Sequence, residues 1–349
     1  MHFSSDNWAG AHPKIAEALS RHATGFAAAY GSSDLDRAVE DRFNEIFERQ
    51  VAVFFVGTGT AANSLSIAAV ARPGGVAFCH TEAHLIMDEG GAPEFLGAGM
   101  RLAGVDGDLG KIEPQALEAT IGRYPPEFVQ AGQPAAVSIS QCTEVGTVYD
   151  PAEIDAIAEI SRRHGLSLHM DGARFANALS ALGTSPAEMT WRRGVDILSF
   201  GATKNGCWCA EAVVVFDPDK AGQMPFIRKR SAHLFSKSRF ISAQFEAYFD
   251  DDLWMENAAH ANAMADRLRQ AIRTSDNARL AWDGSANEVF AIMRRARFDD
   301  LISSGVQFYD WVTPRFATGL VADGEVITRL VTGFATTEQH IADFATLLA

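Results

Sequence analysis

Apolar and polar residues follow two different periods in the first part of the chain, and these periods predict helices and strands in turn. Apolar side chains recur every four residues between Leu35 and Phe47, which predicts an amphipathic helix capped by Ser33. Residues 51–56 are continuously apolar and rich in β-branched and aromatic side chains. Such a short run is typical of a strand buried on both faces, as parallel sheets require.

The same alternation continues through the middle of the chain. Asp150-Pro-Ala-Glu153 combines an N-cap, a proline and an acid at the start of a predicted helix, which ends at Gly165. Strand, helix and strand in this order predict an α/β class with right-handed crossovers and a mostly parallel central sheet. The strands predicted here are residues 135–140, 166–170, 195–200 and 213–216.

The pattern changes after about residue 245. One long alanine-rich helix is predicted from Glu246 to about Arg273, and a final helix opens with a capping box in Thr336-Thr-Glu-Gln339. We therefore expect a large domain of residues 1–245, with the N-terminal segment, and a smaller C-terminal α+β domain of residues 246–349. The strands predicted in the smaller domain are residues 288–294, 306–311 and 325–334.

Composition narrows the classes of function. The 349 residues suit about two domains, and 30 basic against 44 acidic residues give a net charge of -14. That charge argues against nucleic-acid binding. No apolar run reaches the roughly 18 residues of a membrane span, and no secretory signal is visible at the N-terminus. Four cysteines do not make a disulfide scaffold, so we expect a cytoplasmic protein.

A glycine turn is the first candidate site. Gly57, Gly59 and Ala62 match G-x-G-x-x-G/A after a strand and before a helix, and Glu82 follows at the spacing of a ribose-binding acid. This pattern fits an NAD-dependent dehydrogenase. It also fits a helix N-terminus that binds one phosphate with help from threonine hydroxyls such as that of Thr60, or an ordinary tight turn.

Asp171 and Lys204 each follow a predicted parallel strand, at the edge where open α/β sheets place ligands. A partly desolvated lysine can act as a Schiff-base nucleophile. Pyridoxal phosphate needs such a lysine, an anion facing its ring nitrogen and a phosphate cradle. Taken singly, Lys204 also fits a solvated loop and Asp171 a cap. The two residues together with the Gly59-Thr60 turn are more specific.

Other side chains complete or compete with this site. His84, followed by Glu89, fits a ring stacked on a pyridine, or a structural histidine. We expect no metal site, because the histidine spacing is not H-E-x-x-H and Cys207-Trp-Cys209 is not C-x-x-C. Arginine in an apolar strand, such as Arg329, requires an anionic partner. That partner could be a substrate carboxylate or an internal acid.

Taken together, these motifs make the chain similar to a known enzyme family. From Ser4 to about Phe334 the chain resembles the low-specificity L-threonine aldolases, in the β-eliminating lyase group of fold-type-I pyridoxal phosphate enzymes. The stretches that carry it are Ser4-Ser-Asp-Asn7, Tyr30-Gly31, Gly57-Thr-Gly-Thr-Ala-Ala-Asn63, Ala83-His84, Glu89-Gly-Gly91, Leu168-His-Met-Asp-Gly-Ala-Arg174, Gly201-Ala-Thr-Lys-Asn205 and Arg329-Leu-Val-Thr332.

The resemblance implies roles for the cofactor-binding residues. Lys204 forms the Schiff base with pyridoxal phosphate, Asp171 pairs with the pyridine nitrogen and His84 stacks on the ring. The phosphate group is held by the glycine turn and by an arginine of a neighbouring subunit. The residues implied for cofactor binding are Gly59, Thr60, His84, Asp171, Arg174, Lys204 and Arg239.

The resemblance also implies how the substrate is held. Ser5, Arg174 and Arg329 bind the amino-acid carboxylate, and Tyr30 approaches the site across a subunit interface. Members of the family are commonly homotetramers whose sites are shared between the subunits of a dimer. The implied reaction cleaves L-β-hydroxy-α-amino acids, such as threonine, allo-threonine or phenylserine, to glycine and an aldehyde. Another pyridoxal phosphate lyase reaction, β-elimination, is the nearest alternative.

One position departs from the better-known members of that family. Glu144, in Thr143-Glu-Val-Gly146, stands where they carry a histidine associated with the substrate hydroxyl. A carboxylate can accept that proton directly or through water. Glu144, His84 and a held water are the candidate bases, and a structural role for Glu144 fits equally well.

Overall fold

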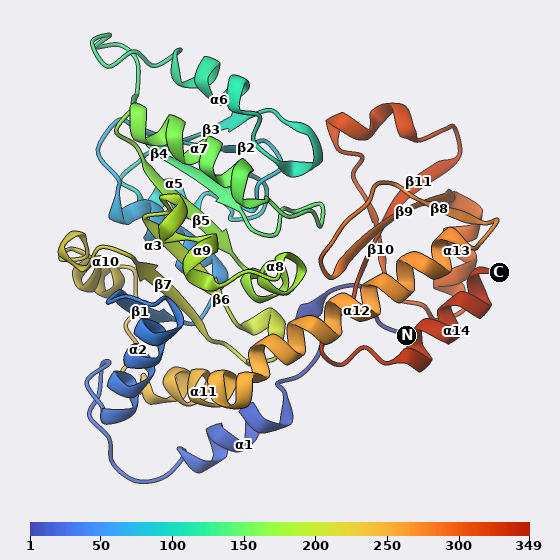
Figure 1. Ribbon diagram of the computed structural model, residues 1–349, viewed down its shortest axis with the longest axis horizontal. Coiled ribbons are helices and arrows are strands. Elements are labelled where there is room, and N and C mark those ends of the chain that lie inside the picture. Colours follow the sequence, from blue (N-terminus) through green and yellow to red (C-terminus); the bar gives the residue numbers. More distant parts are fainter.

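The computed structural model describes residues 1–349 and contains two separate sheets (Figure 1). The larger sheet has seven strands in the order β1-β7-β6-β5-β4-β2-β3. Only β7 runs against its neighbours, so the predicted α/β class with a mostly parallel sheet is confirmed. The strands are β1 (Ala52–Val56), β2 (Gly75–His80), β3 (Arg101–Val105), β4 (Gln133–Ser140), β5 (Ser167–Gly172), β6 (Ile197–Gly201) and β7 (Glu211–Val215).

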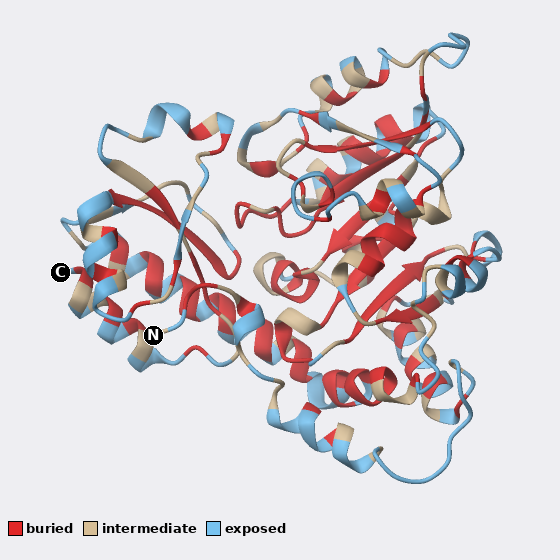
Figure 2. Cartoon of the chain, turned by 180° about the vertical axis from the view of Figure 1, so that it is seen from behind, coloured by how far each residue is buried: buried red, intermediate tan, exposed pale blue.

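Helices cover this sheet on both faces, and its strands, except the edge strand β3, are accordingly buried along most of their length (Figure 2). Ser33 and Asp150 cap α2 and α7, as predicted, and each cap is a complete capping box. The rings of Phe43, Phe200 and Phe245 lie at the centre of the largest core cluster. The helices are α1 (Pro13–Arg21), α2 (Asp34–Ile46), α3 (Gly59–Ala69), α4 (His84–Met87), α5 (Ala92–Leu96), α6 (Pro114–Ile121), α7 (Pro151–Arg163), α8 (Phe175–Leu182), α9 (Pro186–Met189), α10 (Met224–Arg230) and α11 (Arg239–Phe249).

The smaller sheet is antiparallel, in the order β10-β11-β9-β8. The first residues of the chain join it, because the Phe3 amide donates to Gln307 and the Phe3 carbonyl accepts from Val331. None of the helices is both long and apolar enough to cross a membrane. The elements are α12 (Leu253–Arg273), β8 (Ala278–Leu280), β9 (Glu288–Arg294), α13 (Arg295–Ser303), β10 (Tyr309–Trp311), β11 (Glu325–Val331) and α14 (Glu338–Leu348).

The single long helix predicted from Glu246 to Arg273 is wrong. It is broken at Asp250–Asp252, where Asp251 and Asp252 have φ values of 49° and 53°. Aspartate tolerates this left-handed conformation better than most residues, so three consecutive acids permit a sharp change of direction. The final capping box is also displaced by one residue, since Thr337 pairs with His340 instead of Thr336 with Gln339.

Candidate active site

A cavity of about 400 Å³ lies at the carboxyl edge of the large sheet. Three parallel strands lead into it: Gly57 follows β1, Asp171 is near the end of β5, and Lys204 lies in a short 3-10 helix after β6. Parallel strands bring such residues to one edge regardless of their separation in sequence. The predicted site residues that line this cavity are Gly59, Thr60, His84, Asp171 and Lys204.

The glycine turn presents the N-terminus of α3 to the cavity. Thr58 caps the helix by accepting a hydrogen bond from the amide of Ala61 at 3.1 Å. A side chain at Gly57 would meet the Phe235 ring at 2.9 Å, whereas a side chain at Gly59 would meet nothing within 4 Å. Gly59 therefore leaves open space in front of the free backbone N–H groups, as an anion-binding helix terminus requires.

Asn63 joins two of the acidic side chains that line the cavity, Asp171 and Glu89. Its amide nitrogen donates to Asp171 Oδ2 at 2.8 Å and to Glu89 Oε1 at 3.0 Å. The other oxygen of Asp171 accepts from the Ala173 amide at 3.0 Å. Asp171 is thus held by two donors and is almost fully buried. The sequence contains Asn63 within the glycine motif but gives no indication of this bridging position.

His84 is fixed by Glu89. His84 Nδ1 lies 2.8 Å from Glu89 Oε1, and Glu89 is buried. This hydrogen bond raises the pKa of His84 to about 9, against the opposing effect of burial. Burial also acts to raise the pKa of Glu89, but hydrogen bonds from His84, Thr60 and Asn63 outweigh it and hold that pKa below its usual value. The free site therefore contains a protonated imidazole paired with a carboxylate near neutral pH.

Glu211 is a buried carboxyl group that the sequence reasoning missed. It begins β7 and lies opposite Gly201 of β6 and Val56 of β1, so it lines the cavity between Lys204 and the glycine turn. Burial raises its pKa to about 7, while the Thr203 hydrogen bond and the Lys204 charge act in the opposite direction. The sequence feature that could have indicated this buried carboxyl group is the position of Glu211 directly before the apolar run Ala212–Val215.

Glu144 is in the loop that follows β4 and does not line the cavity, but it is close enough for the charges of Lys204 and His84 to act on it. Burial raises the pKa of its carboxyl group, while the charges of Lys204 and His84 lower it. A raised pKa makes a carboxylate a stronger acceptor of protons.

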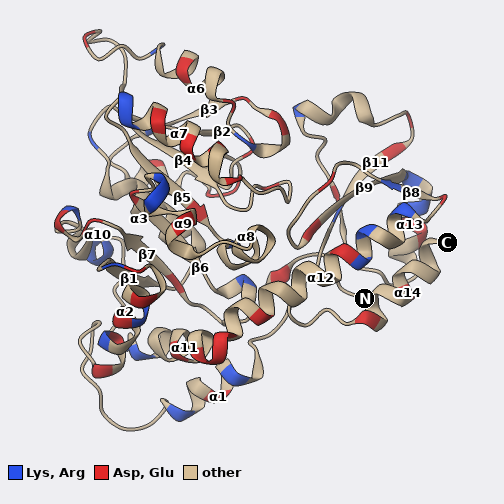
Figure 3. Ribbon diagram, viewed as in Figure 1, with Lys and Arg blue, Asp and Glu red and all other residues tan.

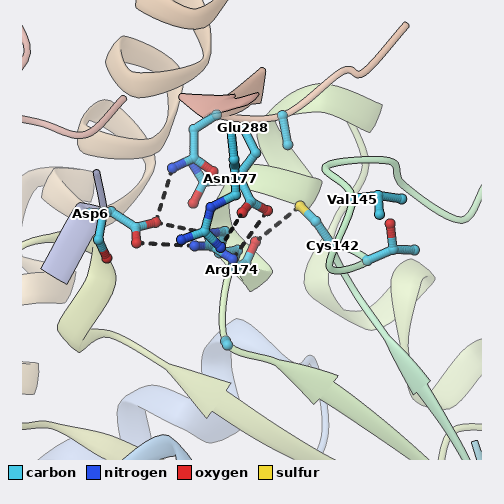
Figure 4. Close-up of polar contacts among 12 residues, drawn as sticks. Asp6, Cys142, Val145, Arg174, Asn177 and Glu288 are labelled. Atoms are coloured by element: carbon cyan, nitrogen blue, oxygen red, sulfur yellow. Dashed lines mark hydrogen bonds and ion pairs between the residues drawn. The ribbon is translucent and has the colours of Figure 1, made fainter. Parts of the chain in front are cut away.

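Arg174 and Arg329 both meet acidic partners, and Figure 4 shows Arg174 between Asp6 and Glu288. Arg174 Nε and Nη2 donate to the two oxygens of Asp6 at 2.7 and 3.1 Å. Its Nη1 lies 3.1 Å from Oε2 of Glu288, and Arg329 Nη1 lies 3.7 Å from Oε1 of the same glutamate. Asp6 and Glu288 were not predicted, because they lie 168 and 114 positions from Arg174 in the chain.

The dinucleotide interpretation of the glycine turn is wrong. That motif binds dinucleotides within a βαβ unit whose two parallel strands are neighbours. Here β1 is an edge strand paired antiparallel to β7, and four strands separate it from β2. Glu82, which follows β2, is therefore not placed as a ribose-binding acid for this turn.

The family model described as "Beta-eliminating lyase" matches residues 2–296. This chain belongs to the β-eliminating lyase family. It is 37% identical over 310 residues to the low specificity L-threonine aldolase of Pseudomonas aeruginosa, with 89% of each chain covered. Threonine aldolase from Leishmania major superposes with a TM-score of 0.91 at 29% identity, over 99% of this chain and 98% of that chain. Catharanthus roseus tryptophan decarboxylase shares the fold, with a TM-score of 0.76 at 17% identity.

The family is dependent on pyridoxal phosphate, and the residues around the cavity fit that cofactor. Gly59 leaves room for a phosphate before the N-terminus of α3, and Lys204 and Asp171 face the same cavity. The oxygen Oδ1 of Asn63 and Oε2 of Glu89 are buried without a hydrogen-bond partner. Such groups indicate a site built to receive a further polar molecule.

The other predicted residues of this β-eliminating lyase family member lie outside the cavity lining. Ser5 caps a 3-10 helix by accepting from the Asn7 amide at 3.1 Å. Tyr30 is 52% exposed, with its ring 5.6 Å from Lys229 Nζ. Arg239 donates to the Gly25 carbonyl at 3.1 Å. Figure 3 shows basic side chains gathered on α10, whose last turn contains Arg228, Lys229 and Arg230.

Proposed function

We propose that this protein uses pyridoxal phosphate to cleave L-β-hydroxy-α-amino acids, of the threonine, allo-threonine or phenylserine type, to glycine and an aldehyde. The observation that carries the proposal is the convergence of Lys204, Asp171 and the Gly57–Thr60 turn on one cavity. The activity named for the Pseudomonas aeruginosa relative supports it. The protein is accordingly a lyase.

Four groups of the chain hold the cofactor. Lys204 attaches it covalently through its amine. Asp171, which accepts hydrogen bonds from Asn63 and Ala173, stabilises the proton on the ring nitrogen. His84 stacks on the ring, and the backbone at Gly59 and Thr60 binds the phosphate. When bound, pyridoxal phosphate accepts the electron pair that bond cleavage leaves at Cα.

The substrate is oriented by its carboxylate and its hydroxyl group. Arg174 and Arg329 bind the carboxylate, and Ser5 assists them. Glu144 receives the proton of the β-hydroxyl group, because burial raises its pKa. His84 does not act as the base, since its hydrogen bond to Glu89 keeps it protonated.

The working form is a cytoplasmic homotetramer in which the two subunits of each dimer share their active sites. Four free cysteines fit a reducing compartment. Phe26, Tyr30 and Phe235 are exposed aromatic side chains, which are typical of an interface between subunits. Tyr30 and Arg239 then act in the site of the neighbouring subunit, which explains why neither lines its own cavity.

The test begins with the visible absorption spectrum of the protein after incubation with pyridoxal phosphate and desalting. The proposal predicts a retained absorption band that changes on addition of glycine and is lost in Lys204→Ala. Products from threonine should be glycine and acetaldehyde. Ammonia and a keto acid would instead assign β-elimination, and a colourless protein or full activity in Lys204→Ala would refute the role of Lys204.

A further inference from the structure

Glu288 lies between Arg174 and Arg329, the two arginines that bind the substrate carboxylate in the proposed function. It is the first residue of β9 in the small sheet, whereas Arg174 immediately precedes α8 beside the large sheet. Its Oε2 is 3.1 Å from Arg174 Nη1, and its Oε1 is 3.7 Å from Arg329 Nη1. The Glu288 carboxylate thus occupies the position expected of an amino-acid carboxylate bound by these arginines.

The charges in this cluster already balance. Asp6 and Glu288 match the two arginines, and the side chains of both acids are almost completely buried, at 1% and 0% exposure. A substrate carboxylate that bound here would add an unmatched negative charge to a desolvated site. Such a juxtaposition of like charges is costly, so the incoming carboxylate competes with one of the two acids.

Glu288 is the weaker competitor of the two acids. Asp6 accepts two hydrogen bonds from Arg174 and one from Asn287 at 3.1 Å. Neither oxygen of Glu288 accepts a hydrogen bond from any group of the protein. Displacing Glu288 therefore breaks ion contacts alone, whereas displacing Asp6 would also leave the Asn287 amide without its acceptor.

We propose that Glu288 is a built-in competitor of the substrate carboxylate, and that it lowers the affinity of the enzyme for α-amino acids. This inference rests on the proposed function, because it needs Arg174 and Arg329 to receive that carboxylate. Glu288 sets how strongly the site distinguishes an amino acid from an amine without a carboxylate. Removing its charge frees the Nη1 group of Arg174 and the Nη1 group of Arg329 for the ligand, while Arg174 stays bound to Asp6.

The experiment measures equilibrium binding to the pyridoxal phosphate holoenzyme by titration calorimetry. Glycine has no β-carbon, so it binds without being cleaved, and glycinamide is its analogue with an uncharged carboxamide. Glu288→Gln keeps the size of the side chain and removes its charge. We expect this variant to bind glycine at least about tenfold more tightly, with glycinamide affinity changed less than about twofold. Glu325→Gln is the matched control, since Glu325 pairs with Arg279 at the far end of β11.

The results separate two failures. If wild-type holoenzyme binds glycine and Glu288→Gln binds it no more tightly, the competition is refuted while the proposed function stands. If the wild-type protein holds no cofactor and binds neither ligand, both proposals fall. Should Glu288→Gln not fold, Glu288→Asp shortens the side chain and weakens the same contacts. That variant should bind glycine more tightly than wild type, and unchanged or weaker binding would refute the inference.

Discussion

The amide nitrogen of Asn63 lies 2.8 Å from Oδ2 of Asp171, and the same nitrogen lies 3.0 Å from Oε1 of Glu89. One neutral side chain therefore bridges two buried carboxylates. Asp171 lies at one end of this network and His84 at the other, so the group proposed to face the ring nitrogen and the group proposed to stack on the ring are linked through Asn63 and Glu89.

Asn63→Ala should destabilise the protein and weaken cofactor binding. The substitution removes a donor from two buried carboxylates, which costs about 1–3 kcal/mol of unfolding free energy. Urea denaturation of the apoprotein and titration with pyridoxal phosphate measure the two effects. Asn177→Ala is the control, because Asn177 is a buried asparagine hydrogen-bonded to Asn262. It should lose stability but retain cofactor affinity, and equal cofactor loss in both variants would contradict the role of Asn63.

Glu89→Gln should lower the pKa of His84 from about 9 toward or below 6.5. The folded-state pKa is raised, so the His84–Glu89 pair contributes stability below pH 6.5 and loses it as pH rises through 9. The stability difference between wild type and variant should therefore shrink over that window. Histidine NMR titration of the apoprotein measures the pKa directly. His233, whose pKa is lowered by burial alone, is the internal control and should not move.

Glu211→Gln should change the pH dependence of stability. Burial raises the pKa of Glu211 from 4.5 to about 7, so the folded protein holds a proton that the unfolded chain releases. Wild-type stability consequently falls as pH rises from 4.5 to 7, and the variant escapes this loss. The apoprotein of the variant should gain on the order of 3 kcal/mol relative to wild type across the window. Parallel stability curves would show that Glu211 titrates normally.

Glu144→Gln should reduce kcat/KM by about 10²–10⁴ and remove the acid limb of the pH profile, because the amide cannot accept the hydroxyl proton. The visible spectrum of the holoenzyme should stay unchanged, which separates loss of the base from loss of the cofactor. Glu82→Gln is the control, since Glu82 belongs only to the refuted dinucleotide interpretation. An unaltered pH profile in Glu144→Gln would assign Glu144 a structural role.

The sequence by itself determined the local elements and the residues at their ends. The run of residues 51–56, the glycine turn, and the positions of Asp171 and Lys204 after strands follow from periodicity and capping. Those rules act over a few residues, so they work without knowledge of the fold. The strand order then brings these residues close together, because the carboxyl ends of parallel strands lie along the same edge of the sheet.

Tertiary structure alone decided the partners of the charged groups. Arg174 pairs with Asp6 across 168 positions, and Asn287 reaches Asp6 across 281. Buried ion pairs form where packing excludes water, and no local sequence pattern indicates which distant acidic residue will lie next to a given arginine. The same holds for Glu211, whose raised pKa depends on strands β1 and β6 on either side. Sequence therefore identified the residues proposed to hold the cofactor, and packing decided the charge balance around them.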